Sequence, residues 1–87
     1  MTKYTIVIDY MGGTYLRQLE AASIDECQAR VHEVMDWDAL APVPTERAID
    51  FGEDNTPSPI KGLTNVWCLS GFIDEEVVLI HVVATAE

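Results

Sequence analysis

The sequence predicts an α+β fold in which two β-hairpins flank one helix (ββαββ). The sheet is expected to be four-stranded and mainly antiparallel, with the helix on one face. Apolar residues alternate near both ends of the chain, each pair of alternating runs is separated by turn-forming residues, and residues 23–40 carry a helical repeat behind a cap signal. With 87 residues, 1–87 is expected to form a single domain.

The first hairpin is predicted from residues 3–22. Tyr4, Ile6, Ile8 and Tyr10 alternate along the first strand, and Thr14 to Ala22 form the second. Gly12-Gly13 supplies the residues with positive φ that a tight hairpin turn needs. The polar content of the second strand favours a position at the sheet edge.

The helix is predicted to begin at Ser23, because Ser23-x-x-Glu26 is a capping box. Apolar residues then recur at spacings of three and four, which gives one buried stripe. The members of the stripe are Ile24, Cys27, Val31, Val34 and Met35. The helix is expected to end near Trp37 or Leu40, before Pro42.

The segment 41–62 is predicted to be irregular and Pro-rich. It contains all four prolines of the chain, and Arg47 to Phe51 is its only stretch with a regular pattern. An irregular segment of this length in a compact domain is uncommon, and is often functional.

The second hairpin is predicted from Asn65 to Ile73 and Val77 to Thr85, around Asp74-Glu75-Glu76. The last strand is apolar on both faces, so we expect it beside the first strand at the centre of the sheet. Since one helix covers one sheet face, the other face is left for residues 41–62, for a second copy of the chain, or for solvent. We expect a homodimer.

The net charge of −10 limits the choice of partners. It opposes direct binding to nucleic acid or to anionic membranes, and it favours association with a basic protein, although solubility alone also selects acidic surfaces. His81 interrupts the longest apolar run, and Asp9 cuts short the apolar N-terminus, so neither a membrane span nor a secretory signal is predicted. The expectation is a cytoplasmic protein.

No pattern of residues predicts catalysis or a cofactor. Asp50-Phe51-Gly52 matches the kinase metal-binding triplet without any accompanying kinase motif. Asp50, Glu53, Asp54 and Asn55 are oxygen ligands, but they lack the spacing of a calcium loop.

The thiol and imidazole groups give a weaker signal. Cys27 and Cys68 are expected to be reduced core residues. Cys68 and His81 share a face if the second hairpin loop is short, yet two ligands are too few for zinc. Arg17 is the basic residue best placed to meet an anion, and we expect it to pair with a neighbouring carboxylate.

The candidate interface residues lie at the end of the predicted helix and within the irregular segment. Asp36-Trp37-Asp38 resembles an interface anchor, with a core role for Trp37 as the alternative. The full predicted set is Asp36, Trp37, Asp38, Asp50, Phe51, Glu53 and Asp54.

The resulting functional hypothesis is a small acidic, non-catalytic module for protein binding or regulation. One alternative is an immunity-type or nucleic-acid-mimicking inhibitor of a basic partner. Another is a small-molecule-binding domain with its pocket between the sheet and residues 41–62.

Overall fold

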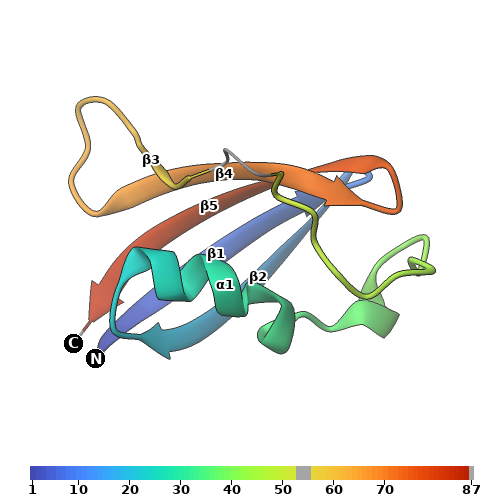
Figure 1. Ribbon diagram of the computed structural model, residues 1–87, viewed down its shortest axis with the longest axis horizontal. Coiled ribbons are helices and arrows are strands. Elements are labelled where there is room, and N and C mark those ends of the chain that lie inside the picture. Colours follow the sequence, from blue (N-terminus) through green and yellow to red (C-terminus); the bar gives the residue numbers. More distant parts are fainter. Residues whose placement is uncertain (53–55, 87) are drawn as a thin grey trace.

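The chain folds as an α+β domain with one α-helix and a five-stranded antiparallel sheet (Figure 1). This computed structural model describes residues 1–52 and 56–86. The elements are β1 (Thr2–Tyr10), β2 (Gly13–Ala21), α1 (Ile24–Val34), the 3₁₀ turn η1 (Trp37–Ala39), β3 (Ser58–Pro59), β4 (Val66–Ile73) and β5 (Glu76–Ala86).

The strand order is β2-β1-β5-β4-β3. The prediction that the first and last strands are central is therefore confirmed, and β2 is an edge strand as expected. The predicted four-stranded ββαββ layout is incomplete, because β3 adds a fifth strand beside β4. A two-residue strand containing a proline shows no alternation, so the sequence pattern could not reveal it.

Both hairpin turns contain two residues with positive φ, as type I′ turns require. Met11 and Gly12 have φ of 50° and 84°, and Asp74 and Glu75 have φ of 50° and 71°. The first turn thus lies one residue before the predicted Gly12-Gly13 pair, and the second is one residue shorter than predicted.

The predicted capping box closes the start of α1. Ser23 Oγ accepts a hydrogen bond from the Glu26 amide at 3.1 Å, and Glu26 Oε2 accepts one from the Ala22 amide at 3.2 Å. The helix ends at Val34, earlier than predicted. Met35 and Trp37 are both buried, and a continued helix would place them about 200° apart. An extended residue at position 35 lets both side chains reach the core.

The core lies between the sheet and α1, which lies across one face of the sheet (Figure 1). Its sheet side is formed largely by Tyr4, Ile6, Ile8, Tyr10, Leu19, Ala21, Leu69, Ile73, Val78, Ile80 and Val82. Ile49 and Phe51 pack against this core. A Cβ on Gly71 would lie 2.7 Å from the Asp50 carbonyl oxygen, so the glycine permits the close approach of this segment to β4.

Candidate functional site

The main surface feature is the sheet face opposite α1, which we call the open face. Strand register places the alternate side chains of four strands on it. They are Thr14, Leu16, Gln18 and Glu20 from β2; Lys3, Thr5, Val7 and Asp9 from β1; Val77, Leu79, His81 and Val83 from β5; and Val66, Cys68, Ser70 and Phe72 from β4.

An apolar band crosses the open face. The band consists of Leu16 from β2, Val7 from β1, Val77 and Leu79 from β5, and Phe72 from β4; Val7 pairs with Leu16, and Phe72 with Val77. The large apolar side chains on this face are only partly covered: the exposed fractions are 61% for Leu16, 50% for Phe72, 55% for Val77 and 44% for Leu79. Phe72 and Val77 pair across β4 and β5, and Leu79 follows Val77 on the same face of β5, so these three adjoin. Adjoining exposed apolar residues mark an interaction site more often than scattered ones do.

Hydrogen-bonded polar side chains flank the apolar band. Thr5 Oγ1 accepts from Gln18 Nε2 at 3.0 Å, and it donates to Thr85 Oγ1 at 3.3 Å. Toward the turns, Thr14 Oγ1 donates to Asp9 Oδ1 at 2.8 Å. These polar groups already have partners, so covering the face leaves fewer of them unsatisfied.

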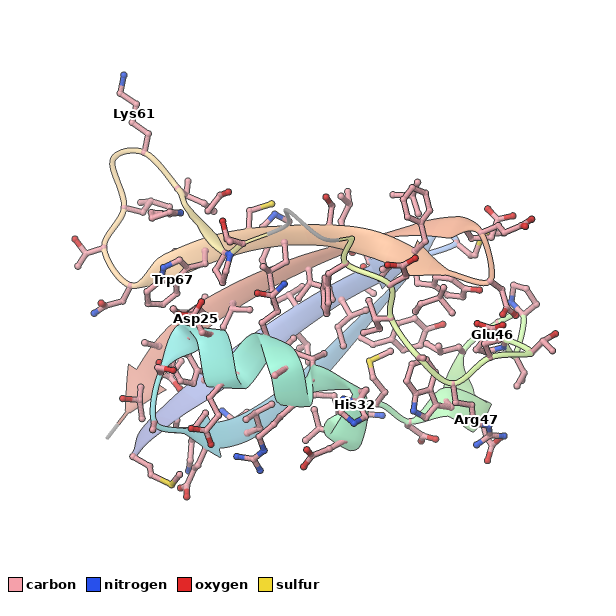
Figure 2. The ribbon with its side chains drawn as sticks, viewed as in Figure 1. Asp25, His32, Glu46, Arg47, Lys61 and Trp67 are labelled. Carbon is pink, nitrogen blue, oxygen red and sulfur yellow. The ribbon has the colours of Figure 1, made fainter. Side chains whose placement is uncertain are left out.

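The negative charge of the chain is concentrated away from the open face. Of the acidic residues that the structure describes, strand alternation places Asp9 and Glu20 on this face, and Glu20 lies directly opposite Lys3. Other charged groups lie on α1 and in the connecting loops, including Asp25, Glu46 and Arg47, while Lys61 extends from the β3–β4 loop (Figure 2). The open face therefore carries a net charge of −1, against −10 for the chain.

Cys68 and His81 lie directly opposite each other on the open face. Counted from the two-residue turn, they form a non-hydrogen-bonded pair, in which the side chains come closest. Among residues 1–52 and 56–86, no group of three or more His, Cys, Asp or Glu side chains could hold a metal ion. The pair thus provides two ligands within the described chain.

Both outer edges of the sheet are partly occupied. On β2, the guanidinium Nη1 of Arg17 donates to the Leu16 carbonyl and that of Arg30 to the Glu20 carbonyl, each at 2.9 Å. On the other side, β3 pairs with β4, and the backbone of Asp50 exchanges two hydrogen bonds with Phe72, at 2.8 and 2.9 Å. Addition of another strand at either edge would have to displace these bonds.

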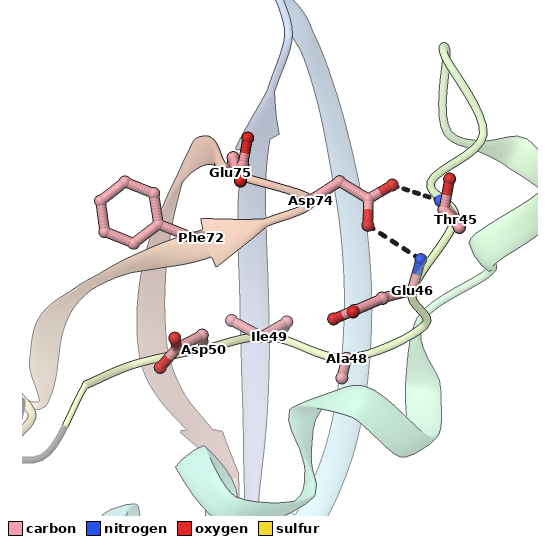
Figure 3. A pocket seen from close by; sticks show the side chains of 8 residues that line it. All are labelled: Thr45, Glu46, Ala48, Ile49, Asp50, Phe72, Asp74 and Glu75. Carbon is pink, nitrogen blue, oxygen red and sulfur yellow. Dashed lines mark hydrogen bonds between the residues drawn. The ribbon is translucent and has the colours of Figure 1, made fainter.

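A second feature, the acidic groove, lies between the loop 45–50 and the β4–β5 turn (Figure 3). Its volume is about 850 Å³, and it is open to solvent. The lining residues are Thr45, Glu46, Ala48, Ile49, Asp50, Phe72, Asp74 and Glu75. The Asp74 carboxylate accepts hydrogen bonds from the backbone amides of Thr45 and Glu46, which ties the loop to the turn.

The predicted anchor Asp36-Trp37-Asp38 is divided between surface and core. Trp37 is 8% exposed and its indole Nε1 donates to the His32 carbonyl at 3.3 Å, so it has the core role that was the alternative. The carboxylates on either side are exposed and paired. Asp36 lies 3.6 Å from Arg17, which confirms the expected pairing of that arginine, and Asp38 pairs with Arg47.

The other predicted residues are placed separately. Asp50 lines the acidic groove, and Phe51 is half-buried against the core. Glu53 and Asp54 lie outside the described residues. The prediction missed Leu16 and Leu79 as surface residues, although the apolar character of both faces of the last strand was the signal for the open face.

Comparison of the chain with protein-family models, with curated proteins and with solved structures found no significant match. Among the described residues, none of the helices has the length and apolar character needed to span a membrane.

Proposed function

We propose that this chain is a non-catalytic protein-binding module, and that the open face is its binding surface. The observation that carries the proposal is the apolar band, with Leu16, Phe72, Val77 and Leu79 exposed by 44–61%. Exposed apolar patches larger than a few hundred Å² are rare on monomeric soluble proteins unless they serve an interaction.

The composition of the face supports this function. An apolar centre with a polar, hydrogen-bonded periphery is the usual anatomy of a protein interface. The face consists of side chains from four neighbouring strands, which suits a broad protein surface better than a small molecule. Its backbone is held in the sheet, so binding requires little ordering of the main chain.

Site-specific photocrosslinking tests the proposal. A photoreactive phenylalanine analogue replaces Leu79 on the open face, and a control chain carries it at the exposed Ala29 of α1. In extracts of the cells that produce the protein, we expect protein adducts from position 79 well above those from position 29. Equal yields from the two positions would contradict the proposed surface.

A second candidate function follows from the acidic groove, whose lining includes four acidic residues and Phe72. A basic protein would meet both opposite charge and an aromatic ring at this place. This is the alternative of an inhibitor that acts on a basic partner.

An oligo-arginine peptide serves as a probe for this second function. We expect its binding to weaken with salt and to fall when Glu46 and Glu75 are both changed to Gln. As a control of equal charge, Asp25→Asn with Glu33→Gln on α1 removes two carboxylates outside the groove. Equal loss of binding in the control would assign the binding to net charge alone.

A further inference from the structure

We infer that the occupant of the open face is a second copy of this chain, so that two sheets pack open face to open face. The inference rests on the proposed function and identifies the partner. Each copy would present the same band to the other around a two-fold axis in the interface, as in an isologous dimer.

Charge favours a second copy over a basic protein at this surface. The open face carries a net charge of −1, whereas the chain carries −10. A basic partner would find more carboxylates on α1 and around the acidic groove, which adjoins the open face at Phe72. Two open faces bring little like charge together, because the sixteen strand residues of each face include only Asp9 and Glu20 as acids, with Lys3 opposite Glu20.

The area of the face is sufficient for a specific dimer. Four strands about 4.8 Å apart, each with about eight residues rising about 3.3 Å, give roughly 500 Å² per copy. Two copies would bury about 1,000 Å², which is near the lower limit for a specific interface and implies a reversible dimer.

The sheet edges favour face packing over strand addition. The arginine bonds to the Leu16 and Glu20 carbonyls occupy acceptors on the outer edge of β2. At the other edge, β3 and Asp50 already pair with β4. Packing of two open faces leaves these bonds in place and produces a two-sheet sandwich with the helices outside.

Size-exclusion chromatography with light scattering tests the inference. The purified full chain is measured over a dilution series. The wild-type chain is expected to form a dimer that dissociates on dilution. Leu79→Glu would bury a carboxylate in each half of the interface, and should weaken dimerisation by at least about tenfold. The control is Val43→Glu, because Val43 is 53% exposed in the loop after η1 and lies on none of the four strands. It should dimerise like the wild type.

A footprinting measurement on the unmodified chain keeps the test independent of mutant folding. Hydroxyl-radical labelling of Phe72 and Leu79 should decrease as protein concentration rises, while labelling of Val43 should not. Labelling that falls equally at all three residues would contradict packing through the open face.

The outcomes separate this inference from the proposed function. If the pure chain stays monomeric while position 79 crosslinks to other proteins, the second copy is refuted and the binding function stands. If it stays monomeric and position 79 gives no excess adducts, both are refuted. A dimer that Leu79→Glu leaves intact would refute the open face as its interface.

Discussion

The two thiol groups of this protein have different surroundings, and this difference is visible at the scale of single residues. Cys27 lies on the buried side of α1, and burial raises the pKa of its thiol from the ordinary value of 9.0 to about 11, against a smaller lowering by Arg30. Cys68 is half-buried on the open face. Since the thiolate is the reactive form, burial protects Cys27 twice, by excluding reagent and by holding the proton.

In dilute solution at neutral pH, one thiol per chain should therefore react with a thiol reagent, and Cys68→Ser should abolish this reaction. Reaction of the Cys27 thiol with the same reagent should require unfolding of the chain. Reaction of two thiols at equal rates would contradict the burial of Cys27. At higher protein concentration the reaction of Cys68 should slow, because dimerisation covers the open face.

Alkaline pH should destabilise the fold through the same buried thiol. Above about pH 9 the unfolded thiol loses its proton, while the folded one keeps it until about pH 11, so this stabilising term is complete below pH 9 and disappears by pH 11. The expected loss in the free energy of unfolding is about 3 kcal/mol, measured by urea denaturation at each pH.

The control for this pH dependence is Cys27→Ala. It should cost about 1 kcal/mol at neutral pH through the lost side chain, but should flatten the decrease between pH 9 and 11. Some decrease should remain in this variant, because burial raises the pKa of Tyr4 and of Tyr10, for which Asp74 and Glu76 add a smaller contribution. An unchanged slope in Cys27→Ala would assign the alkaline sensitivity to other groups.

At the scale of elements, the two hairpin turns share a backbone geometry but differ in how well their residues fit it. Gly12 occupies the second central position of the first turn, with φ of 84°, and Glu75 the equivalent position of the second, with φ of 71°. A residue with a Cβ is strained in this left-handed region, whereas glycine is not.

Glu75→Gly should therefore stabilise the fold by about 1 kcal/mol, and Gly12→Ala should destabilise it by a similar amount. Chemical denaturation of both variants gives the comparison. Glu75→Gln removes the charge but keeps the Cβ, so it separates relief of strain from relief of repulsion among the turn carboxylates. If Glu75→Gln stabilised the fold as much as Glu75→Gly, the strain would not be the cause.

At the scale of the whole molecule, the uneven distribution of charge predicts how salt acts on self-association. Two chains of −10 repel each other even when their open faces are nearly neutral. Screening shortens the range of this repulsion to about 8–10 Å near physiological salt, so added salt should strengthen the dimer.

The dimer dissociation constant, measured by sedimentation, is expected to fall several-fold between about 20 mM and about 500 mM NaCl. Binding of oligo-arginine in the acidic groove should weaken over the same range. A dimer that weakens with salt would contradict association through the nearly uncharged open face.

Local patterns in the sequence predicted most secondary-structure elements of this protein. Alternation along residues 3–10 and an apolar run on both faces of residues 77–85 predicted two central strands, and Ser23 with Glu26 predicted the start of the helix. These features depend on neighbours along the chain, so the sequence carries them directly. The turn at Met11 was missed because adjacent glycines allow either of two registers, and only the pairing of Tyr10 with Gly13 distinguishes them.

The candidate site was only partly predictable. The single predicted helix left one sheet face uncovered, and the last strand indicated that this face is apolar. The sequence did not show whether residues 41–62 would cover it. Trp37 was predicted as a possible anchor from its acidic neighbours, and burial of its indole depends on the helix ending at Val34.

By itself, then, the sequence determined the number of hairpins, the central strands, the helix cap and the strongly acidic balance, because periodicity and composition are local properties. The tertiary structure decided the rest. It placed Ile49 and Phe51 against the core, brought Cys68 opposite His81, and left Leu16 and Leu79 exposed together. The physical reason is that these relations depend on strand register and on the path of an irregular segment, and both are set by contacts between residues far apart in the chain.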